Sequence, residues 1–327
     1  MFRGASSFNQ DLNFWNTSNV TNMQQMFDGA SAFNGNVSTW DVTKVTSGLA
    51  PYRLFASSGF NGDLSSWNVS TWSSLYGVFQ SSAFNNNSIS NWNVSNVNRF
   101  QGTFSGNTVF NQDISGWNTS NANRMDQMFS NADAFNQDLS TWNVSGVTNM
   151  ASMFQDRGNS PDSNLNISGW TTTSLTNTTA MFKNTGGNTQ DLSGWNMSNV
   201  DFIQEMFAYG RINFNPSSWN IAPSVMWNTF LFSSSIAGNI DTWNLYGWNI
   251  TGLTQAQNFL NGQTLSTTNY DATLVAWENQ LQTAYPGGVG YTPINSISFG
   301  GSKYSLGSAA EAARTSLINT YSWTITD

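Results

Sequence analysis

The segment "FNQDISGWNTSNANRMDQMFSNADAFNQDLSTWNVSGVTNMASMF", Phe110 to Phe154, contains two near copies of one unit. Each copy has Phe-Asn-Gln-Asp, then Trp-Asn, then Met-Phe, in the same order. Alignment on the tryptophan extends the pattern to ten units, with gaps of 25, 27, 25, 25, 25, 28, 25, 24 and 24 residues. A period of this length is typical of a solenoid in which each unit forms one coil. The aligned residues are Trp15, Trp40, Trp67, Trp92, Trp117, Trp142, Trp170, Trp195, Trp219 and Trp243.

The repeat predicts a leucine-rich-repeat-like solenoid with one short parallel β-strand per coil. The alternation of Trp142 and Val144 favours a strand whose tryptophan points into the core. The later apolar residues Val147, Met150 and Met153 recur every three residues. That spacing predicts a helical or 3₁₀ turn on the opposite side of the coil.

The residue after each tryptophan is usually asparagine. Stacked coils place equivalent residues about 4.7–4.9 Å apart, so we expect these side chains to form a ladder that satisfies backbone groups where the coil bends. The position four residues before the tryptophan is mostly Asp or Asn, which suits a turn residue that bonds its own backbone. The predicted ladder comprises Asn16, Asn68, Asn93, Asn118, Asn143, Asn196, Asn220 and Asn244.

The two ends of the chain differ from the repeats. The period stops at Thr254, so we predict a solenoid over 1–253 and an α+β capping domain over 254–327. Within the cap, the sequence predicts helices in the stretches 265–282 and 305–321 and strands in 294–299 and 322–327. The first unit begins within the repeat, and we therefore expect self-association or docking over its apolar face. That face comprises Phe2, Phe8, Leu12 and Trp15.

The composition excludes several classes of function. The chain has no cysteine and no histidine, which removes Cys-His and Ser-His-Asp nucleophiles and histidine zinc sites. A net charge of −8 with ten Lys and Arg residues argues against nucleic acid as a partner. The sequence contains no run of 18 apolar residues, so we expect no membrane insertion. We therefore expect a non-enzymatic protein without a cofactor or a structural metal.

Two rows of polar residues are candidate sites. The carboxylates at one repeat position could form a glycosidase pair or a calcium site, but asparagine replaces them in other units, which favours a turn role. The Ser and Thr residues beside each tryptophan predict a polar face that either covers the sheet or binds a carbohydrate or a protein. Phe14 and Tyr246 replace small polar residues and are candidate surface contacts. The carboxylates are Asp11, Asp63, Asp113, Asp138 and Asp191.

The unit "FNQDLSTWNVSGVTNMASMF", from Phe135, resembles the BspA-like, leucine-rich-repeat-related surface proteins, including the repeat of mycoplasma lipoproteins. The stretches "LSTTNYDATLVAW" and "GGSKYSLGSAAEAARTSLINTYSWTITD" resemble the closing segment of such proteins. The resemblance implies an extracellular or cell-surface protein that acts in adhesion or interaction, and it implies no catalytic residues.

Three functional hypotheses follow. The first is an extracellular repeat protein for adhesion, recognition or assembly, with a protein or a glycan as its partner. The second is a structural subunit of a virion appendage, a filament or a surface layer, which fits an uncovered first unit. The third is an ice- or carbohydrate-surface binder, which the small number of threonines in the hydroxyl rows makes a weaker hypothesis.

Overall fold

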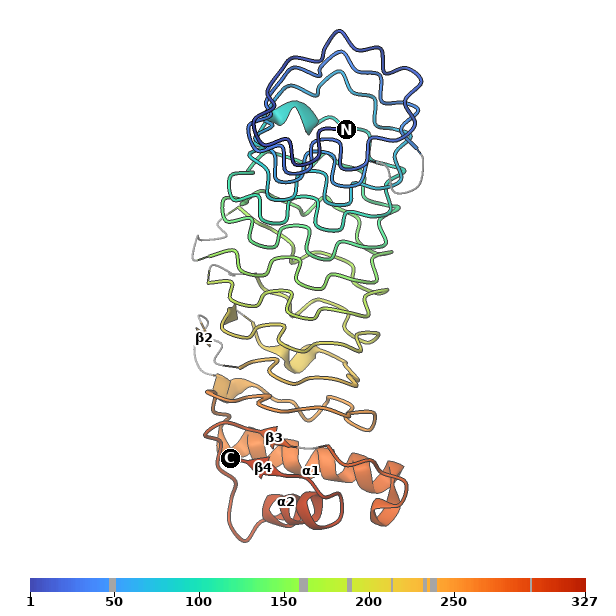
Figure 1. Ribbon diagram of the computed structural model, residues 1–327. Coiled ribbons are helices and arrows are strands. Elements are labelled where there is room, and N and C mark those ends of the chain that lie inside the picture. The colour runs from blue at the N-terminus through green and yellow to red at the C-terminus, as the bar shows by residue number, and fades with distance from the viewer. Residues whose placement is uncertain are drawn as a thin grey trace. The chain divides into compact units, whose positions relative to one another are not determined.

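The computed structural model describes residues 1–46, 51–158, 164–186, 190–212, 214–231, 234–235, 240–294 and 296–327. The chain forms two compact units, Met1–Thr171 and Thr172–Asp327. The division between them lies inside the repeats, and the domain boundary predicted after residue 253 stays a prediction. The C-terminal helices therefore belong to the same unit as the later coils. Figure 1 shows the coils of the first unit in blue to green.

Adjacent coils are joined by backbone hydrogen bonds in the segment that contains Met-Phe. Met125, Gln127 and Phe129 donate their backbone N–H groups to Asn149, Ala151 and Met153 of the next coil, at 3.0, 2.8 and 2.9 Å. The alternate residues bond within their own coil, as Met128 N does to Met125 O at 3.2 Å. We call this part of each coil the paired segment. Parallel β-bridges lie in it, and the first unit has the register Ser74, Arg99, Arg124 and Asn149.

This arrangement reverses the predicted sides of the coil. The paired segment, expected to be helical, has positive φ at Gln127 (59°) and Asn131 (55°), a backbone that does not continue a right-handed helix. The Trp-x-Val segment, expected to be a strand, lies between two turns and forms no strand in the described residues. In it Trp142 N donates to Leu139 O at 3.0 Å, and Val147 N donates to Val144 O at 2.9 Å. The alternation that predicted a strand arises from two successive turns.

The short 3₁₀ helices lie on the tryptophan side rather than opposite it. In the first unit η1 spans Asn87–Ile89. In the second unit η2 spans Pro216–Ser218 and η3 spans Ile240–Thr242. Each of these three elements ends within three residues of the aligned tryptophan of its coil.

Aromatic rings form columns through the core of the first unit. Phe104 stacks on Phe129 of the next coil with ring centroids 5.8 Å apart, and Phe110 stacks on Phe135 at 5.9 Å. Within one coil Phe129 and Phe135 stack at 3.9 Å. The residues of these columns are buried, so each coil presents nearly the same apolar surface to its neighbours.

The second unit ends in two helices and a small sheet. Helix α1 spans Thr267–Ala284 and helix α2 spans Ala309–Asn319. Strands β3 (Ile297–Ser298) and β4 (Ile325–Thr326) pair in parallel, as do β1 (Arg211–Ile212) and β2 (Ser234–Ser235). A further 3₁₀ turn, η4, spans Pro286–Gly288. Asn295, which lies in one of the predicted strands, falls outside the described residues.

Helix α1 continues the hydrogen-bonding pattern of the coils that precede it. Ser266 caps the helix by accepting a hydrogen bond from Asn269 N at 3.2 Å. The buried Trp277 donates its indole N–H to Leu245 O at 3.0 Å. Trp72 donates in the same way to Val42 O at 3.3 Å, and each acceptor lies two residues after the aligned tryptophan of its coil. The helix thus packs on the last coil.

A half-buried ion pair fixes the residue after the last strand to both helices. Arg314 of α2 donates to both carboxylate oxygens of Asp327 at 2.8 Å, and the Tyr270 hydroxyl of α1 donates to Oδ2 at 2.6 Å. Burial, the hydrogen bond to Asp327 and its charge raise the pKa of Tyr270. Burial alone would raise the pKa of Asp327, but the bonds from Arg314 and Tyr270 lower it.

Candidate recognition surface

Side-chain-capped turns build a row of exposed polar residues along the tryptophan side of the coils. In one coil Asp138 Oδ1 accepts a hydrogen bond from Ser140 N at 2.9 Å, and Asn143 Oδ1 accepts from Ser145 N at 3.0 Å and from Ser145 Oγ at 2.7 Å. Asx turns of this kind hold the backbone without using the remaining polar atoms of the side chain. We call this row, from the aspartate position to the serine after the asparagine, the Asx face.

The tryptophan between the two turns anchors the Asx face to the core. Nine of the ten aligned tryptophans are buried and Trp15 is half-buried. The indole N–H of Trp117 donates to Ile89 O of the preceding coil at 2.9 Å, and that of Trp142 donates to Ile114 O at 3.0 Å. The indole is a second donor to a carbonyl that already closes a turn of the neighbouring coil, as Ile89 O does by accepting from Trp92 N at 3.0 Å. It also fixes the spacing of successive Asx turns.

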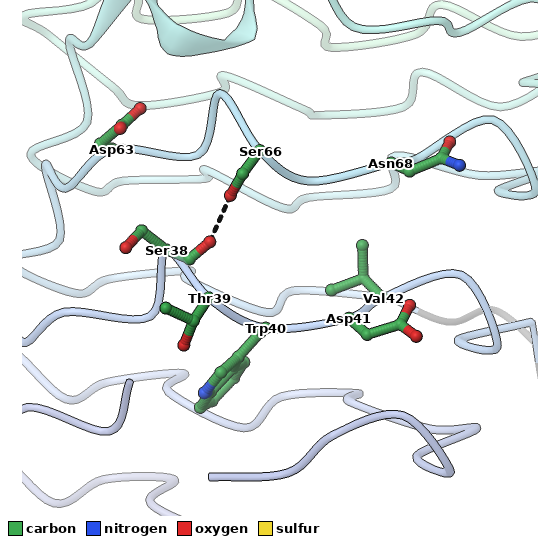
Figure 2. Close-up of a pocket in the computed structure, with 8 residues that line it drawn as sticks. All are labelled: Ser38, Thr39, Trp40, Asp41, Val42, Asp63, Ser66 and Asn68. Atoms are coloured by element: carbon green, nitrogen blue, oxygen red, sulfur yellow. Dashed lines mark hydrogen bonds between the residues drawn. The ribbon is translucent and has the colours of Figure 1, made fainter. Parts of the chain in front are cut away.

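The Asx face is indented between the second and third coils of the first unit. The groove there has a volume of about 510 Å³, and Figure 2 shows the residues that line it. It is lined by Ser38, Thr39, Trp40, Asp41, Val42, Asp63, Ser66 and Asn68. The side chain of Ser66 crosses it to donate to Ser38 O of the preceding coil.

A second groove continues the first along the same face. Its volume is about 360 Å³, and Asn68 lines both grooves. Because Asn68 Oδ1 holds its own turn by accepting from Ser70 N at 3.1 Å, its amide nitrogen remains available to a ligand. The other lining residues are Ser65, Trp67, Val69, Asn87, Ser88, Asn91, Trp92 and Asn93.

Two carboxylates of the Asx face accept hydrogen bonds that lower their pKa values. Hydrogen bonds from the Thr43 hydroxyl and backbone lower the pKa of Asp41. The Ser115 backbone and hydroxyl lower the pKa of Asp113 in the same way. A glycosidase pair needs one carboxyl with a raised pKa, so the lowered pKa of Asp113 argues against Asp113 as the general acid of such a pair.

The aspartates that were weighed as calcium ligands hold turns in the structure. Among the described residues no group of three or more Asp or Glu side chains lies close enough to hold a metal ion. Each of Asp63, Asp113 and Asp138 instead accepts a hydrogen bond from the backbone N–H two residues later, at 2.9 Å.

In the described part of the chain, six of the eight asparagines after the tryptophans use their side-chain oxygens within their own coils rather than in a ladder between coils. The oxygens of Asn16, Asn93, Asn118 and Asn196 accept bonds within their own coils, as those of Asn68 and Asn143 do. The ladder is instead formed by the asparagine of the Phe-Asn-Gln-Asp stretch. Asn111 Oδ1, for example, accepts from Asn136 N of the next coil at 2.9 Å. The same contact recurs along Asn9, Asn34, Asn61, Asn85, Asn111, Asn136 and Asn164. Its signal in the sequence was the recurrence of this asparagine beside the stacked phenylalanine.

The two predicted surface aromatics are both exposed but belong to different units. Phe14 is 77% exposed in the first unit, and Tyr246 is 48% exposed in the second. Neither lines the two grooves.

The predicted docking face of the first unit has a cavity of its own. The cavity has a volume of about 300 Å³ and includes Met1, Trp15, Met23 and Met26 among its lining residues. Phe2 and Phe8 beside it are half-buried, and Leu12 is buried. Docking at this face stays a prediction.

The fold and this face define a repeat protein whose polar surface recurs from coil to coil. The family model described as "Mycoplasma protein of unknown function, DUF285" matches residues 1–83, 51–161 and 142–243. The chain belongs to this family. Comparisons with the curated proteins and with the solved structures found no match. Over the described ranges, no helix has the length and apolar character needed to span a membrane.

Proposed function

We propose that the protein is a non-enzymatic recognition module, displayed outside the cell or on its surface, that binds glycans through the Asx face. The proposal includes a leucine-rich-repeat-related solenoid of about ten coils, with the C-terminal segment covering the last coil. Membership of a mycoplasma repeat family supports a surface role, since the sequence resembles the BspA-like surface repeats.

The observation that carries the proposal is the pair of adjoining grooves on the Asx face. They are lined mostly by hydroxyl, amide and carboxylate groups held by turns, and each includes tryptophan atoms at its base. Sugars present many hydroxyl groups, which pair with such mixed donors and acceptors. Because the turns already fix the side chains, little conformational entropy is lost when a ligand binds.

Affinity would accumulate over several coils. A single neutral hydrogen bond contributes about 0.5–1.5 kcal/mol, so one coil alone would bind weakly. Linked sites on one rigid surface raise the apparent affinity of a polymeric ligand through a high effective concentration. We therefore expect longer oligosaccharides to bind more tightly than monosaccharides.

Asn68→Asp is the sharpest test because it keeps the turn and changes one group in the grooves. The retained Oδ1 still accepts from Ser70, while the amide donor becomes an oxygen acceptor. Glycans that a binding screen identifies would be titrated by calorimetry, and we expect about 2- to 10-fold weaker binding. Asn149→Asp is the matched control, since Asn149 Oδ1 accepts from Ala151 N at 2.9 Å in a turn of the paired segment, outside both grooves and outside the Asx face.

The result that would overturn the proposal is an unchanged affinity in Asn68→Asp or an equal loss in both variants. Absence of any bound glycan at millimolar concentration would do the same. In that case filaments or particles in the native source, seen by electron microscopy, would favour the structural-subunit hypothesis. Antibody labelling of intact cells tests the proposed location, and chemical analysis of incubated glycans tests the absence of turnover.

A further inference from the structure

The paired segment of the first unit carries a cluster of tyrosine and arginine residues. Tyr52 and Tyr76 are the only tyrosines between residues 1 and 171. They lie edge to face with ring centroids 4.9 Å apart, and both are half-buried. Arg99 follows on the next coil and is exposed. We call Tyr52, Arg53, Tyr76 and Arg99 the Tyr-Arg surface.

Backbone pairing fixes the positions of these residues. Arg53 N donates to Tyr76 O at 3.0 Å, and Leu75 N donates to Arg99 O at 2.8 Å. The three coils that carry the surface are therefore in register. Since these backbone groups are already bonded between coils, a ligand on this surface must be recognised through side chains.

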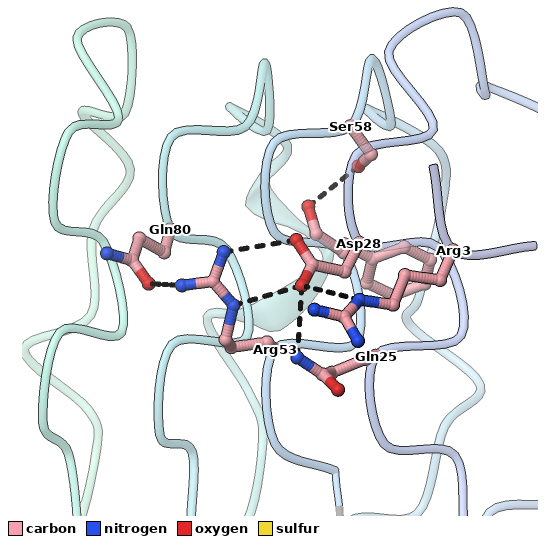
Figure 3. A network of polar contacts seen from close by, with 7 residues as sticks. Arg3, Gln25, Asp28, Arg53, Ser58 and Gln80 are labelled. Atoms are coloured by element: carbon pink, nitrogen blue, oxygen red, sulfur yellow. Dashed lines mark hydrogen bonds and ion pairs between the residues drawn. The ribbon is translucent and has the colours of Figure 1, made fainter. Parts of the chain in front are cut away.

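A polar network immobilises one arginine of the surface. Arg53 donates to both carboxylate oxygens of Asp28 at 3.1 Å and to Gln80 Oε1 at 2.6 Å (Figure 3). The hydrogen bonds that Arg53 donates to Asp28 raise the pKa of Arg53, with smaller contributions from both tyrosines. Its stem crosses the next coil at Gly77, where an added Cβ would lie 3.0 Å from Arg53 Cγ. Arg53 is thus a fixed support between the two tyrosines.

The remaining donors of the surface are available to a ligand. Within the described ranges, Arg99 forms no ion pair or side-chain hydrogen bond, and the hydroxyls of Tyr52 and Tyr76 form no hydrogen bond. Arg124, beside Arg99 in the bridge register, is paired with Asp126 at 2.9 Å. Asp28 is shared by Arg53 and Arg3, the latter at 3.9 Å. This group contains four positive charges and two negative charges, although the whole chain has a net charge of −8. The charged residues are Arg3, Arg53, Arg99, Arg124, Asp28 and Asp126.

We propose that the Tyr-Arg surface binds an acidic segment of a protein partner, separately from the glycans of the Asx face. Tyr and Arg are enriched at the centres of protein interfaces and dominate their binding energy. Carboxylates pair with the Arg99 guanidinium and accept hydrogen bonds from the two phenols. The half-buried rings supply apolar contact area with little conformational freedom to lose.

Fluorescence anisotropy with a labelled octa-glutamate peptide tests the proposal on the whole chain. We expect Arg99→Ala to weaken binding about 10-fold or more, and Tyr76→Phe, which removes only the hydroxyl, to weaken it about 2- to 5-fold. Lys44→Ala is the matched control. Lys44 is an exposed cation that contacts Asn19 at 2.9 Å and lies outside the paired segment. Unchanged unfolding midpoints would show that the variants are folded.

The controls separate this proposal from its alternatives. Equal losses in Arg99→Ala and Lys44→Ala would show non-specific charge attraction and overturn it, as would no binding at millimolar peptide. Tighter binding of an acidic oligosaccharide such as polygalacturonate at Arg99 would also overturn it, because the partner would then be a glycan. We expect Arg99→Ala to bind neutral glycans as the parent protein does. If the Tyr-Arg surface does not bind the acidic peptide, the glycan proposal for the Asx face is therefore unaffected.

Discussion

Replacing Trp117 with alanine tests how the coils are held together. The side chain is 2% exposed, stacks on Trp142 at 6.4 Å and donates to Ile89 O at 2.9 Å. Its loss leaves a cavity shared by neighbouring coils, which costs about 3–5 kcal/mol of unfolding free energy. The Ile89 carbonyl still accepts from Trp92 N at 3.0 Å, so the lost indole bond adds about 0.5–1.5 kcal/mol and places the expected value in the upper half of that range.

Trp117→Phe divides the two contributions. It keeps most of the ring volume and removes the indole N–H, so we expect it to cost about 1–3 kcal/mol. Phe14→Ala is the surface control, and we expect its effect to stay within about 0.5 kcal/mol because Phe14 is 77% exposed. Urea unfolding followed by far-UV circular dichroism measures all three variants.

Long repeat arrays can unfold in parts, so hydrogen exchange should accompany the urea curves. In Trp117→Ala the amides of the flanking coils, such as Trp142, should exchange faster than in the parent protein. The reasoning is refuted if Phe14→Ala destabilises the chain as much as Trp117→Ala. It is also refuted if Trp117→Phe costs as much as Trp117→Ala, because the cavity would then contribute nothing.

Three further outcomes are expected. Asn111→Ala should cost about 0.5–1.5 kcal/mol because it removes a bond to Asn136 N of the next coil, whereas Asn118→Ala should cost less because its bond to Ser120 N lies within one coil; urea unfolding compares them. The folded state raises the pKa of Tyr270, so its contribution to stability is fully present below the unfolded pKa of about 10 and is lost as the pH rises through the folded pKa. Tyr270→Phe should therefore flatten the alkaline loss of stability in thermal melts. The lowered pKa of Asp327 acts oppositely: its contribution is present above about pH 4 and is lost as the pH falls through the folded pKa, so Asp327→Asn should remove that acid dependence.

The sequence predicted the spacing of the coils better than their backbone. The recurrence of tryptophan and phenylalanine located the buried positions, because each coil presents the same surface to the next. The same apolar spacing predicted a helix in the paired segment, where the backbone instead turns at positive φ at Gln127 and Asn131. No glycine marks these two positions, so the sequence contained no strong signal of the turn.

The candidate surface was predicted in part. The aspartate row was recognised as a set of turn residues, and the hydrogen bonds of Asp113 and Asp138 fit that role. The asparagine ladder was assigned to the wrong position, because spacing alone cannot distinguish bonds within a coil from bonds between coils. The Tyr-Arg surface escaped notice because Tyr52, Tyr76 and Arg99 occur once each in coils of differing length, and only the backbone register brings them together.

The indole bond from each tryptophan to the preceding coil has a consequence for how such a chain changes length in evolution. Trp117 bonds to Ile89, and Trp142 bonds in the same way to Ile114. A gene duplication or deletion that adds or removes one whole 25-residue unit here would recreate every donor and acceptor at the junction. Trp277 of α1 already occupies the carbonyl of Leu245, so growth at that end would need a new terminator. Repeat number can therefore vary within the array while the helical end stays constant.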